Sequence, residues 1–504
     1  MSHIKKQKVI IIGAGFGGIS LAALLSKKGF EVHIYEKNEQ VGGRARIFSE
    51  QGYTFDMGPS WYMMPDVFED FFSVLGENIQ DYFTLTRLSP SYRVFLKSEN
   101  CHYDFFSDRK KNGELFESIE PGSAQKLFDY LDESARQYQI AKKEFMYKNY
   151  DSIFDFFNKR VMQEGRKLEI FNTMKKIIGR TFKSELLQKV MQFQMVLLGT
   201  APKDAPGIYR LMNHVDFDLG VWYPNKGIYE LPRAIASIAE KNGTTIHLNS
   251  PIKKIIVKDK KVLGVTLESG EDVFADIVVS NADMHYTEQT LLGEELSDRK
   301  ESYWAKKKMA PSALIMYLGT GKQFDSLSHH NLLFSEDWDL NFKQIFDTDM
   351  FPEDPSIYVC APSKTDKTVA PEGKENLFVL VPIASGLTYD TETLEKWADN
   401  VISILEKNMG MTGLRESIEY KKIYCVKDFE RDYHSYKGSA LGLAHTLTQS
   451  ALWRPNNVSK KVKGLYFVGA NTNPGIGMPI CVISAETVYK RILGITDPEP
   501  LKEI

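Results

Sequence analysis

The stretch Lys-Val-Ile-Ile-Ile-Gly-Ala-Gly-Phe-Gly-Gly, residues 8–18, decides the fold of this chain. Its apolar, β-branched run at residues 9–12 is typical of a parallel strand that is covered on both faces. A periodic apolar segment follows and stops near Gly29, which predicts a helix. Strand, glycine loop and helix in this order form the turn at which open α/β sheets bind the phosphates of a dinucleotide.

The glycines of this turn have separate tasks. Gly13 permits the tight turn, Gly15 lets the backbone approach a pyrophosphate, and Gly18 lets the helix pack close to the strand. Residues 31–36 predict a second strand that ends in Glu36, whose carboxylate can accept hydrogen bonds from ribose hydroxyl groups. Because a carboxylate disfavours a 2′-phosphate, NADP is not expected here.

A second pair of glycines follows at residues 42–45, Gly-Gly-Arg-Ala. Gly43 allows another close backbone approach, and Arg44 can make a charge-assisted contact to phosphate; a glycine turn with a surface arginine is the structural alternative. Together with the first loop and Glu36, this segment resembles the FAD superfamily that contains amine oxidases, protoporphyrinogen oxidases and carotenoid desaturases. The resemblance implies FAD as the cofactor.

The same resemblance extends along the chain. Residues 55–61 resemble a segment that returns to the flavin, and a plain Gly-Pro turn without contact to a cofactor is the alternative. Residues 223–231 resemble a Tyr-Pro-x-Gly-Gly element in which Lys226 replaces the first glycine. The segments 244–248, 251–258, 261–267 and 273–279 predict strands of a β-meander on the adenine side, where Ile252 would meet the adenine.

The C-terminal motif is an apolar strand at residues 464–468, then a glycine-rich loop and a helix from about Cys481. A helix start at the flavin would stabilise negative charge on the reduced ring. The segment 474–479 most resembles the carotenoid desaturase branch, but Asn473 replaces the usual histidine and residues 480–481 replace Gly-Val. The predicted cofactor-binding residues are Gly13, Gly15, Gly18, Glu36, Lys37, Gly43, Arg44, Gly58, Pro59, Ser60, Ile252, Gly469, Ala470, Gly475, Ile476, Gly477 and Met478.

The predicted fold is α/β, with a Rossmann-type FAD-binding domain, an α+β substrate domain and a helical region. The FAD-binding domain combines residues 1–65, 222–300 and 456–504. The substrate domain combines residues 66–105 and 301–455, and its apolar runs at 312–318 and 377–384 predict strands, the second interrupted by Pro382. Residues 106–221 form the helical region, with a possible membrane contact.

Composition argues against several classes of protein and of binding site. A net charge of −3 gives no general argument for nucleic acid binding. The four cysteines form no Cys-x-x-Cys and predict reduced thiols of a cytosolic protein. His329 and His330 are adjacent, but surface or core histidines are favoured over a metal site, so no metal is expected. The apolar run after the N-terminal lysines is shorter than the roughly 7–15 residues of a signal peptide, and no run approaches the roughly 18 of a membrane span.

Residues 158–189 carry nine Lys/Arg and three Asp/Glu, with apolar residues at helical spacing. A basic amphipathic helix can lie on an anionic membrane, and a surface helix with its apolar face in the core is the alternative. A carotenoid resides in the bilayer, so we expect a cytoplasmic protein associated peripherally with the inner face of the membrane. The spaced apolar positions are Phe171, Met174, Ile178, Phe182 and Leu186.

The resemblance implies desaturation of a long carotenoid polyene, in which flavin N5 takes a hydride and the neighbouring carbon loses a proton. Extended conjugation can delocalise the charge, so no motif has to supply a strong base, and the catalytic residue is unknown. Residues 480–481 favour late desaturation at C-3,4 of a 1-hydroxylated carotenoid. Phytoene or diapophytoene desaturase is the alternative. The electron acceptor, oxygen or a quinone, is open.

Other classes remain as alternatives at this stage. A carotenoid isomerase or saturase would use the same flavin in its reduced form. Amine oxidases usually hold the flavin through a cysteine, and none of the four cysteines lies in a matching motif. A lipid-escort protein related to GDI would share the first loop without flavin binding, which the intact Glu36, Arg44 and 475–477 loop disfavour.

Overall fold

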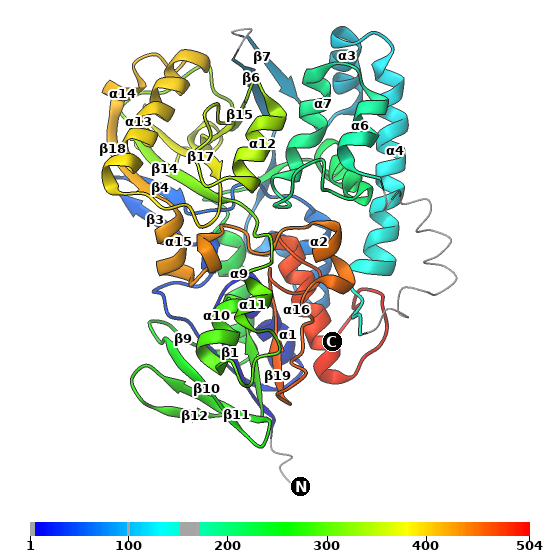
Figure 1. The fold of residues 1–504 in the computed structure, drawn as a ribbon, viewed down its shortest axis with the longest axis vertical. Helices are drawn as coiled ribbons and strands as arrows, with labels where there is room; N and C mark the ends of the chain where they lie inside the picture. Colours follow the sequence, from blue (N-terminus) through cyan, green and yellow to red (C-terminus); the bar gives the residue numbers. More distant parts are fainter. Residues whose placement is uncertain (1–5, 98–100, 152–168, 170–171) are drawn as a thin grey trace.

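The computed structural model describes residues 6–97, 101–151, 169 and 172–504 (Figure 1). A parallel sheet and a small antiparallel meander form the lower half in this view. A larger, mainly antiparallel sheet and a helical lobe form the upper half. The chain passes between the two halves several times, so each half is assembled from segments that are distant in sequence.

The parallel sheet has the strand order β19-β13-β1-β2-β9. The central strand β1 is buried because its Val9–Ile12 run meets side chains on both faces, and it pairs with β13 and β2 in parallel register. Helix α1 packs between α9 and α16 on the sheet. The bounds are β1 Lys8–Ile12, β2 Glu31–Tyr35, β9 Thr245–His247, β13 Ile277–Ser280, β19 Leu465–Phe467, α1 Phe16–Lys27, α9 Glu230–Lys241 and α16 Met478–Leu493.

The predicted four-stranded meander is wrong in two of its strands. Only β10 Ile252–Lys258, β11 Lys261–Leu267 and β12 Asp272–Phe274 pair antiparallel as a meander. The predicted strand 273–279 is two strands, β12 and β13, and both β9 and β13 belong to the parallel sheet. The physical reason is burial: β13 is buried at all of its positions, as a strand inside a parallel sheet must be.

The larger sheet has the order β18-β14-β17-β16-β15-β6-β7. The predicted interruption by Pro382 is wrong, since β17 continues through it and Pro382 pairs with Ala313. Strand β16 reaches β17 only as far as Leu380, so proline occupies a locally open edge. The bounds are β6 Tyr92–Leu96, β7 Cys101–Phe105, β14 Ser312–Thr320, β15 His330–Phe334, β16 Ile357–Cys360, β17 Glu375–Ile383, β18 Ile418–Tyr424, α12 Trp338–Asp347 and α13 Thr391–Asn408.

The helical lobe contains α3 Arg109–Ile119, α4 Ser123–Ala141, α6 Met174–Thr181 and α7 Glu185–Gln192. Part of the basic segment 158–189, including Phe171, lies outside the described residues. The described part is not one amphipathic helix, because Thr173 and Ser184 each cap a separate short helix. Met174, Ile178 and Phe182 are buried in the lobe core, whereas Leu186 is only partly buried.

Smaller elements connect the two halves, and helix α15 in particular lies against the loop that follows β2. All strands of the parallel sheet fall within the ranges predicted for the FAD-binding unit, and the three-unit division itself stays a prediction. No helix among the described residues has both the length and the hydropathy to cross a bilayer. The remaining bounds are β3 Ile47–Glu50, β4 Tyr53–Asp56, β5 Leu85–Arg87, β8 Trp222–Pro224, α2 Pro65–Val74, α8 Leu211–His214, α10 Met284–Tyr286, α11 Glu301–Trp304, α14 Leu414–Ser417 and α15 Val426–Tyr433.

Candidate active site

A cavity of about 1120 Å³ runs from the carboxyl ends of the parallel strands to the larger sheet. Single small-molecule sites usually enclose about 300–1,000 Å³, so this cavity has room for a dinucleotide and part of a second ligand. All predicted cofactor-binding residues line it except Gly18, Gly469 and Gly475. The cavity therefore gathers residues from the beginning, the middle and the end of the chain.

The first glycine loop leaves backbone N–H groups free at the start of α1. Gly15 is the N-cap of α1, and no side chain accepts from the first turn. A Cβ on Gly15 would lie 2.7 Å from the Asn281 side chain, and a Cβ on Gly18 would overlap the Gly13 carbonyl oxygen. Only glycine fits at position 18, and a side chain at position 15 would have to displace Asn281. The uncapped helix end is suited to a pyrophosphate.

The carboxylate of Glu36 is fixed in a position from which it can accept hydrogen bonds from ribose hydroxyls, as the sequence predicted. One carboxylate oxygen accepts the Ala14 N–H at 2.7 Å, and the other accepts the Asn38 N–H at 2.9 Å. Burial raises the pKa of Glu36, while these two backbone bonds oppose the shift. The carboxylate faces the cavity with lone pairs remaining, which fits hydrogen bonds from ribose hydroxyls.

The contacts of Arg44 also bear on whether the cavity suits FAD. Its Nη2 donates to the Ser435 hydroxyl at 3.0 Å and to the Ser439 carbonyl oxygen at 3.3 Å. Its Nε is buried, and no described residue accepts from it. A buried guanidinium N–H that lines the cavity needs an acceptor, and an FAD phosphate or ring oxygen would supply one.

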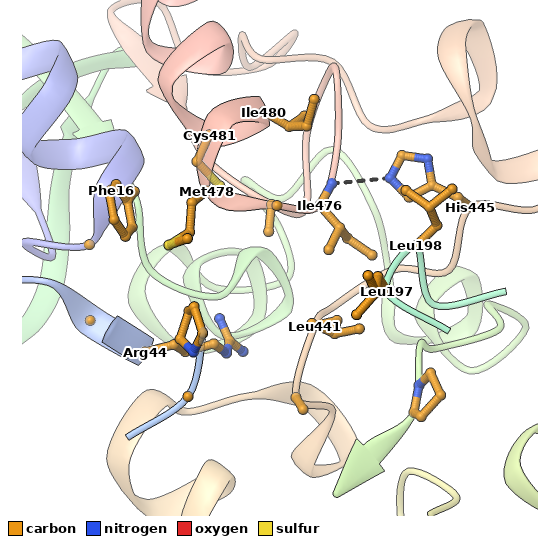
Figure 2. Close-up of a pocket in the computed structure, with 18 of the residues that line it drawn as sticks. Phe16, Arg44, Leu197, Leu198, Leu441, His445, Ile476, Met478, Ile480 and Cys481 are labelled. Atoms are coloured by element: carbon orange, nitrogen blue, oxygen red, sulfur yellow. Dashed lines mark hydrogen bonds between the residues drawn. The ribbon is translucent and has the colours of Figure 1, made fainter. Parts of the chain in front are cut away.

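The second glycine-rich loop ends at the start of α16, and it meets a histidine that the sequence did not indicate (Figure 2). Gly477 is the N-cap, with φ +118° and no side-chain cap. The Ile476 N–H donates to His445 Nε2 at 3.0 Å, so that nitrogen carries no proton. A Cβ on Gly475 would overlap the His445 ring, which explains this glycine even though it does not line the cavity.

His445 belongs to a short polar chain along the cavity wall. Its Nδ1 lies 2.6 Å from the Tyr209 hydroxyl, which lies 3.1 Å from the Ser450 hydroxyl. Burial, with Arg454 nearby, holds the pKa of His445 well below its usual range, so the ring is neutral. Nδ1 therefore donates to Tyr209, Tyr209 donates to Ser450, and Ser450 donates to the Thr446 carbonyl oxygen.

Arg454 supports the same loop from behind. It is buried and donates to the carbonyl oxygens of Thr472 at 3.0 Å and Ala470 at 2.5 Å. These bonds fix the turn between β19 and α16, including the predicted residue Ala470. Gly469 lies under this turn, and a Cβ on it would come within 2.8 Å of Asn281 Oδ1. Arg454 and His445 have no sequence motif that marks their roles.

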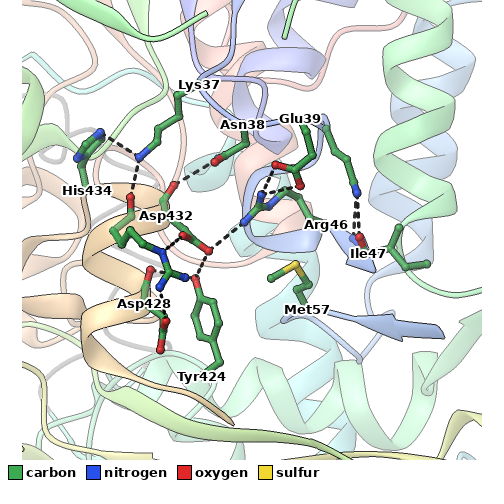
Figure 3. A network of polar contacts seen from close by, with 12 residues as sticks. Lys37, Asn38, Glu39, Arg46, Ile47, Met57, Tyr424, Asp428, Asp432 and His434 are labelled. Atoms are coloured by element: carbon green, nitrogen blue, oxygen red, sulfur yellow. Dashed lines mark hydrogen bonds and ion pairs between the residues drawn. The ribbon is translucent and has the colours of Figure 1, made fainter. Parts of the chain in front are cut away.

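The segment after β2 is tied to α15 by a polar network (Figure 3). Arg46 bonds Glu39 at 2.9 Å and Asp432 at 3.1 Å. The predicted site residue Lys37 lines the cavity, but its Nζ donates to the Arg431 carbonyl oxygen at 2.6 Å and lies 3.2 Å from His434 Nε2. Lys37 thus also joins the two halves of the molecule.

The remaining predicted residues complete the floor of the cavity. Gly58 packs on the Arg44 backbone, since a Cβ there would lie 2.7 Å from the Arg44 carbonyl oxygen. Ser60 shares a hydrogen bond of 2.7 Å with the Tyr358 hydroxyl. Ile252 is buried and lines the cavity beside the meander, where the resemblance expects the adenine.

The far part of the cavity is apolar. Strands β15 and β16, helix α12 and the segment 193–212 supply mainly aliphatic and aromatic side chains. The lining carboxylates among the described residues are Glu36, Glu268, Asp283 and Asp432, and none of these lies on the larger sheet. A long hydrocarbon can therefore lie there without burying an unpaired charge. The apolar lining includes Leu197, Leu198, Leu332, Phe334, Trp338, Phe342, Ile345 and Ile357.

Residues 16–493 match the family described as flavin containing amine oxidoreductase. The chain belongs to this family. The free helix ends, the Glu36 carboxylate and the unpaired Arg44 Nε fit FAD, and the protein is an FAD-dependent oxidoreductase. Its fold is the FAD-binding amine oxidase type that the sequence predicted.

Curated relatives place the chain in the carotenoid desaturase branch of the family. It is 41% identical to the carotenoid 3,4-desaturase of Haloarcula japonica, covering 98% of this chain and 99% of the relative. It is 34% identical to the zeta-carotene-forming phytoene desaturase of Myxococcus xanthus, covering 97% and 94%. It is 33% identical to the 4,4′-diapophytoene desaturase of Staphylococcus aureus, covering 99% of each chain.

Solved structures share the fold at low sequence identity. A variant of putrescine oxidase superposes with a TM-score of 0.63 at 13% identity, covering 97% of this chain and 99% of that one. Rab GDI from Plasmodium falciparum superposes with a TM-score of 0.57 at 12% identity, covering 98% and 99%. A putrescine oxidase and a Rab GDI thus share one architecture, so the fold alone does not decide the function.

Proposed function

We propose that this protein is an FAD-dependent carotenoid desaturase that acts late, at C-3,4 of a 1-hydroxylated carotenoid. The observation that carries the proposal is the 41% identity to a carotenoid 3,4-desaturase over nearly the whole of both chains. The apolar cavity that is continuous with the flavin site supports a polyene substrate. The departure at Ile480-Cys481 from the usual Gly-Val agrees with the late reaction, and both residues line the cavity.

The residues of this chain have mainly binding and positioning tasks. When bound, FAD supplies the two-electron acceptor that takes a hydride from an allylic carbon while the neighbouring carbon loses a proton. The apolar walls hold the chain in one orientation and exclude water from the reacting carbons. The uncapped start of α16 favours negative charge at its end of the cavity. Among the described residues, no carboxylate of the larger sheet lines the cavity.

A second candidate is phytoene or diapophytoene desaturation. It is favoured by identities of 34% and 33% to enzymes of those names, again over nearly the full chain. The two candidate reactions differ in which carbon–carbon bond of the substrate lies at the flavin. The same cavity could accommodate either substrate.

A pigment assay tests the proposal. The gene would be expressed in cells that make phytoene and, separately, in cells that make a 1-hydroxylated monocyclic carotenoid. We expect the absorption of the extract to move to longer wavelength only with the hydroxylated substrate. New colour from phytoene would support the second candidate. Unchanged spectra in both strains, with flavin-loaded protein present, would reject desaturation and favour isomerase, saturase or another flavin oxidase.

We also propose that the protein lies on the inner face of the cytoplasmic membrane, where it collects substrate and passes electrons to oxygen or a quinone. Trp453 and Leu447 line the cavity and yet are 57% and 39% exposed, so an apolar lip surrounds part of its mouth. Exposed cations lie on α6 and just after it: Lys175, Lys176, Arg180 and Lys183. Such cations are attracted to anionic lipid.

Liposome binding tests the membrane proposal. Neutralising the four exposed cations of the α6 region should lower co-sedimentation with anionic liposomes severalfold, because each contributes up to about 1 kcal/mol near the surface. The charge-matched control neutralises exposed lysines of the meander: Lys253, Lys254, Lys258 and Lys260. Equal co-sedimentation of the α6 variant and the parent would reject this contact.

A further inference from the structure

Two histidines and a cysteine meet behind the cavity wall, although they are not part of the flavin site. His330 begins β15, Cys360 ends β16, and the two are direct partners in the antiparallel ladder. His329 precedes β15 and is 3% exposed, while His330 is 0% and Cys360 2% exposed. One side-chain nitrogen of each histidine and the Cys360 sulfur all lie within 4.8 Å of one another.

Each histidine has one satisfied and one unsatisfied nitrogen. His329 Nδ1 lies 2.7 Å from the Thr365 hydroxyl, and His330 Nδ1 lies 2.8 Å from the Tyr358 hydroxyl. Neither Nε2 has a hydrogen-bond partner among the described residues, although both are buried. Leaving a buried polar atom unpaired costs about 1–3 kcal/mol, so two such atoms on rings that gather beside one thiol require an explanation.

The hydroxyl partners are compatible with the tautomers that a metal would need. If Nδ1–H donates to Thr365 and to Tyr358, each Nε2 keeps a free lone pair. Tyr358 can donate onward to Ser60, 2.7 Å away, so the chain of donors is complete. Metal-binding histidines usually have this arrangement, in which the second ring nitrogen donates to a fixed acceptor.

We propose that His329 Nε2, His330 Nε2 and Cys360 Sγ bind one Zn²⁺ ion. Imidazole and thiolate are the ligands that zinc prefers, and two histidines with one cysteine leave one position of a tetrahedron for water. Binding releases the thiol proton to solvent and forms the zinc–sulfur bond.

Zinc binding replaces the thiol proton of Cys360, so protons compete with the ion for this ligand. We therefore expect zinc to bind more weakly as the pH falls.

The ion would have a structural role next to the substrate. Trp61 stacks on the His330 ring with centroids 4.4 Å apart, and Trp61, Tyr358 and Ser60 all line the large cavity. Zinc would lock the ends of β15 and β16 together behind these side chains. The proposal does not depend on which carotenoid the enzyme uses.

Metal analysis of the untagged holoprotein tests the site. The protein would be expressed with zinc in the medium and purified without chelator, and mass spectrometry would count metal per chain. We expect about one zinc per chain in the parent and in His102→Gln, which changes an exposed histidine on β7 of the same sheet. His329→Gln and Cys360→Ser should each lower the zinc content at least tenfold. Full zinc in both variants, or a metal-free parent, would overturn the proposal.

A second measurement avoids variants that fail to fold. Parent protein freed of metal would be titrated with Co²⁺, which replaces zinc and gives a thiolate-to-metal charge-transfer band when sulfur is a ligand. A band that saturates at one equivalent and is lost when excess Zn²⁺ is added is the expected result. Absence of the band with folded, flavin-loaded protein would mean that the two Nε2 atoms bind only buried water.

Discussion

The flavin end and the polyene end of one cavity are built in different ways. At the flavin end, backbone N–H groups and a few polar side chains come from loops directly after β1, β2 and β19. At the polyene end, side chains of β15, β16 and α12 form an apolar surface with few hydrogen bonds to the cavity. The first end recognises a fixed chemical group, whereas the second end only has to match a shape.

This difference predicts which changes each end tolerates. Glycines of the flavin end tolerate little exchange, because a Cβ at several of them would overlap the neighbouring backbone or the Asn281 side chain. Apolar wall residues can be exchanged for others of similar volume at a cost usually below about 1.5 kcal/mol. Substitutions at the flavin end should therefore change flavin content, and substitutions at the polyene end should change only substrate use.

The largest effect is expected from Gly18→Val. Its side chain would overlap the Gly13 carbonyl oxygen, and Asn281 lies 3.3 Å from the new Cβ, so the loop cannot keep its path. We expect protein without flavin, or insoluble protein. Gly179→Ala is the matched control, because its Cβ would meet nothing closer than 3.9 Å. A yellow, fully loaded Gly18→Val protein would contradict the proposed role of this loop.

The second-largest effect is expected from Glu36→Ala. It removes a carboxylate that accepts two backbone N–H groups and faces the cavity. Losing charged hydrogen bonds costs about 1.5–3 kcal/mol, which weakens flavin binding about 10- to 150-fold. Flavin titration measures this loss of affinity, and Glu50→Ala, which changes an exposed glutamate, is the control. We expect the flavin affinity of Glu36→Gln to lie between those of the parent and of Glu36→Ala. Unchanged flavin content in Glu36→Ala would remove Glu36 from the site.

His445→Ala tests the boundary between the two ends. The Ile476 N–H loses its acceptor, so we expect about fivefold weaker flavin binding, near 1 kcal/mol, together with a lower kcat. His445→Gln should recover part of both, since an amide oxygen can accept the same bond. Because burial keeps the pKa of His445 well below its usual range, neither variant should move the pH profile between about pH 6 and 9. A shifted profile would instead indicate direct proton transfer by His445.

The smallest effect is expected from Phe342→Leu on α12. Phe342 is buried and lines the apolar end, so the change mainly enlarges the cavity there. We expect unchanged flavin content and a KM change of no more than about tenfold, since exchanging one apolar wall residue for another usually costs below about 1.5 kcal/mol. Loss of flavin in this variant would show that the two ends are not independent.

The sequence by itself determined the flavin end. Gly13, Gly15, Glu36 and Arg44 lie in or just after one strand–loop–helix–strand unit, so short sequence separations largely set their arrangement. The loop before α16 is local in the same way. The meander was partly wrong because short apolar strands look alike in sequence, and only pairing decides that β13 joins the parallel sheet.

Only the tertiary structure decided the contacts made across long separations. His445 and Tyr209 are 236 positions apart, and Lys37 reaches His434 across 397, so no motif spans either pair. His330 meets Cys360 because the register of β15 and β16 sets them opposite each other. Local motifs follow from covalent spacing, whereas these contacts follow from how sheets and helices bury apolar surface, which depends on the whole chain at once.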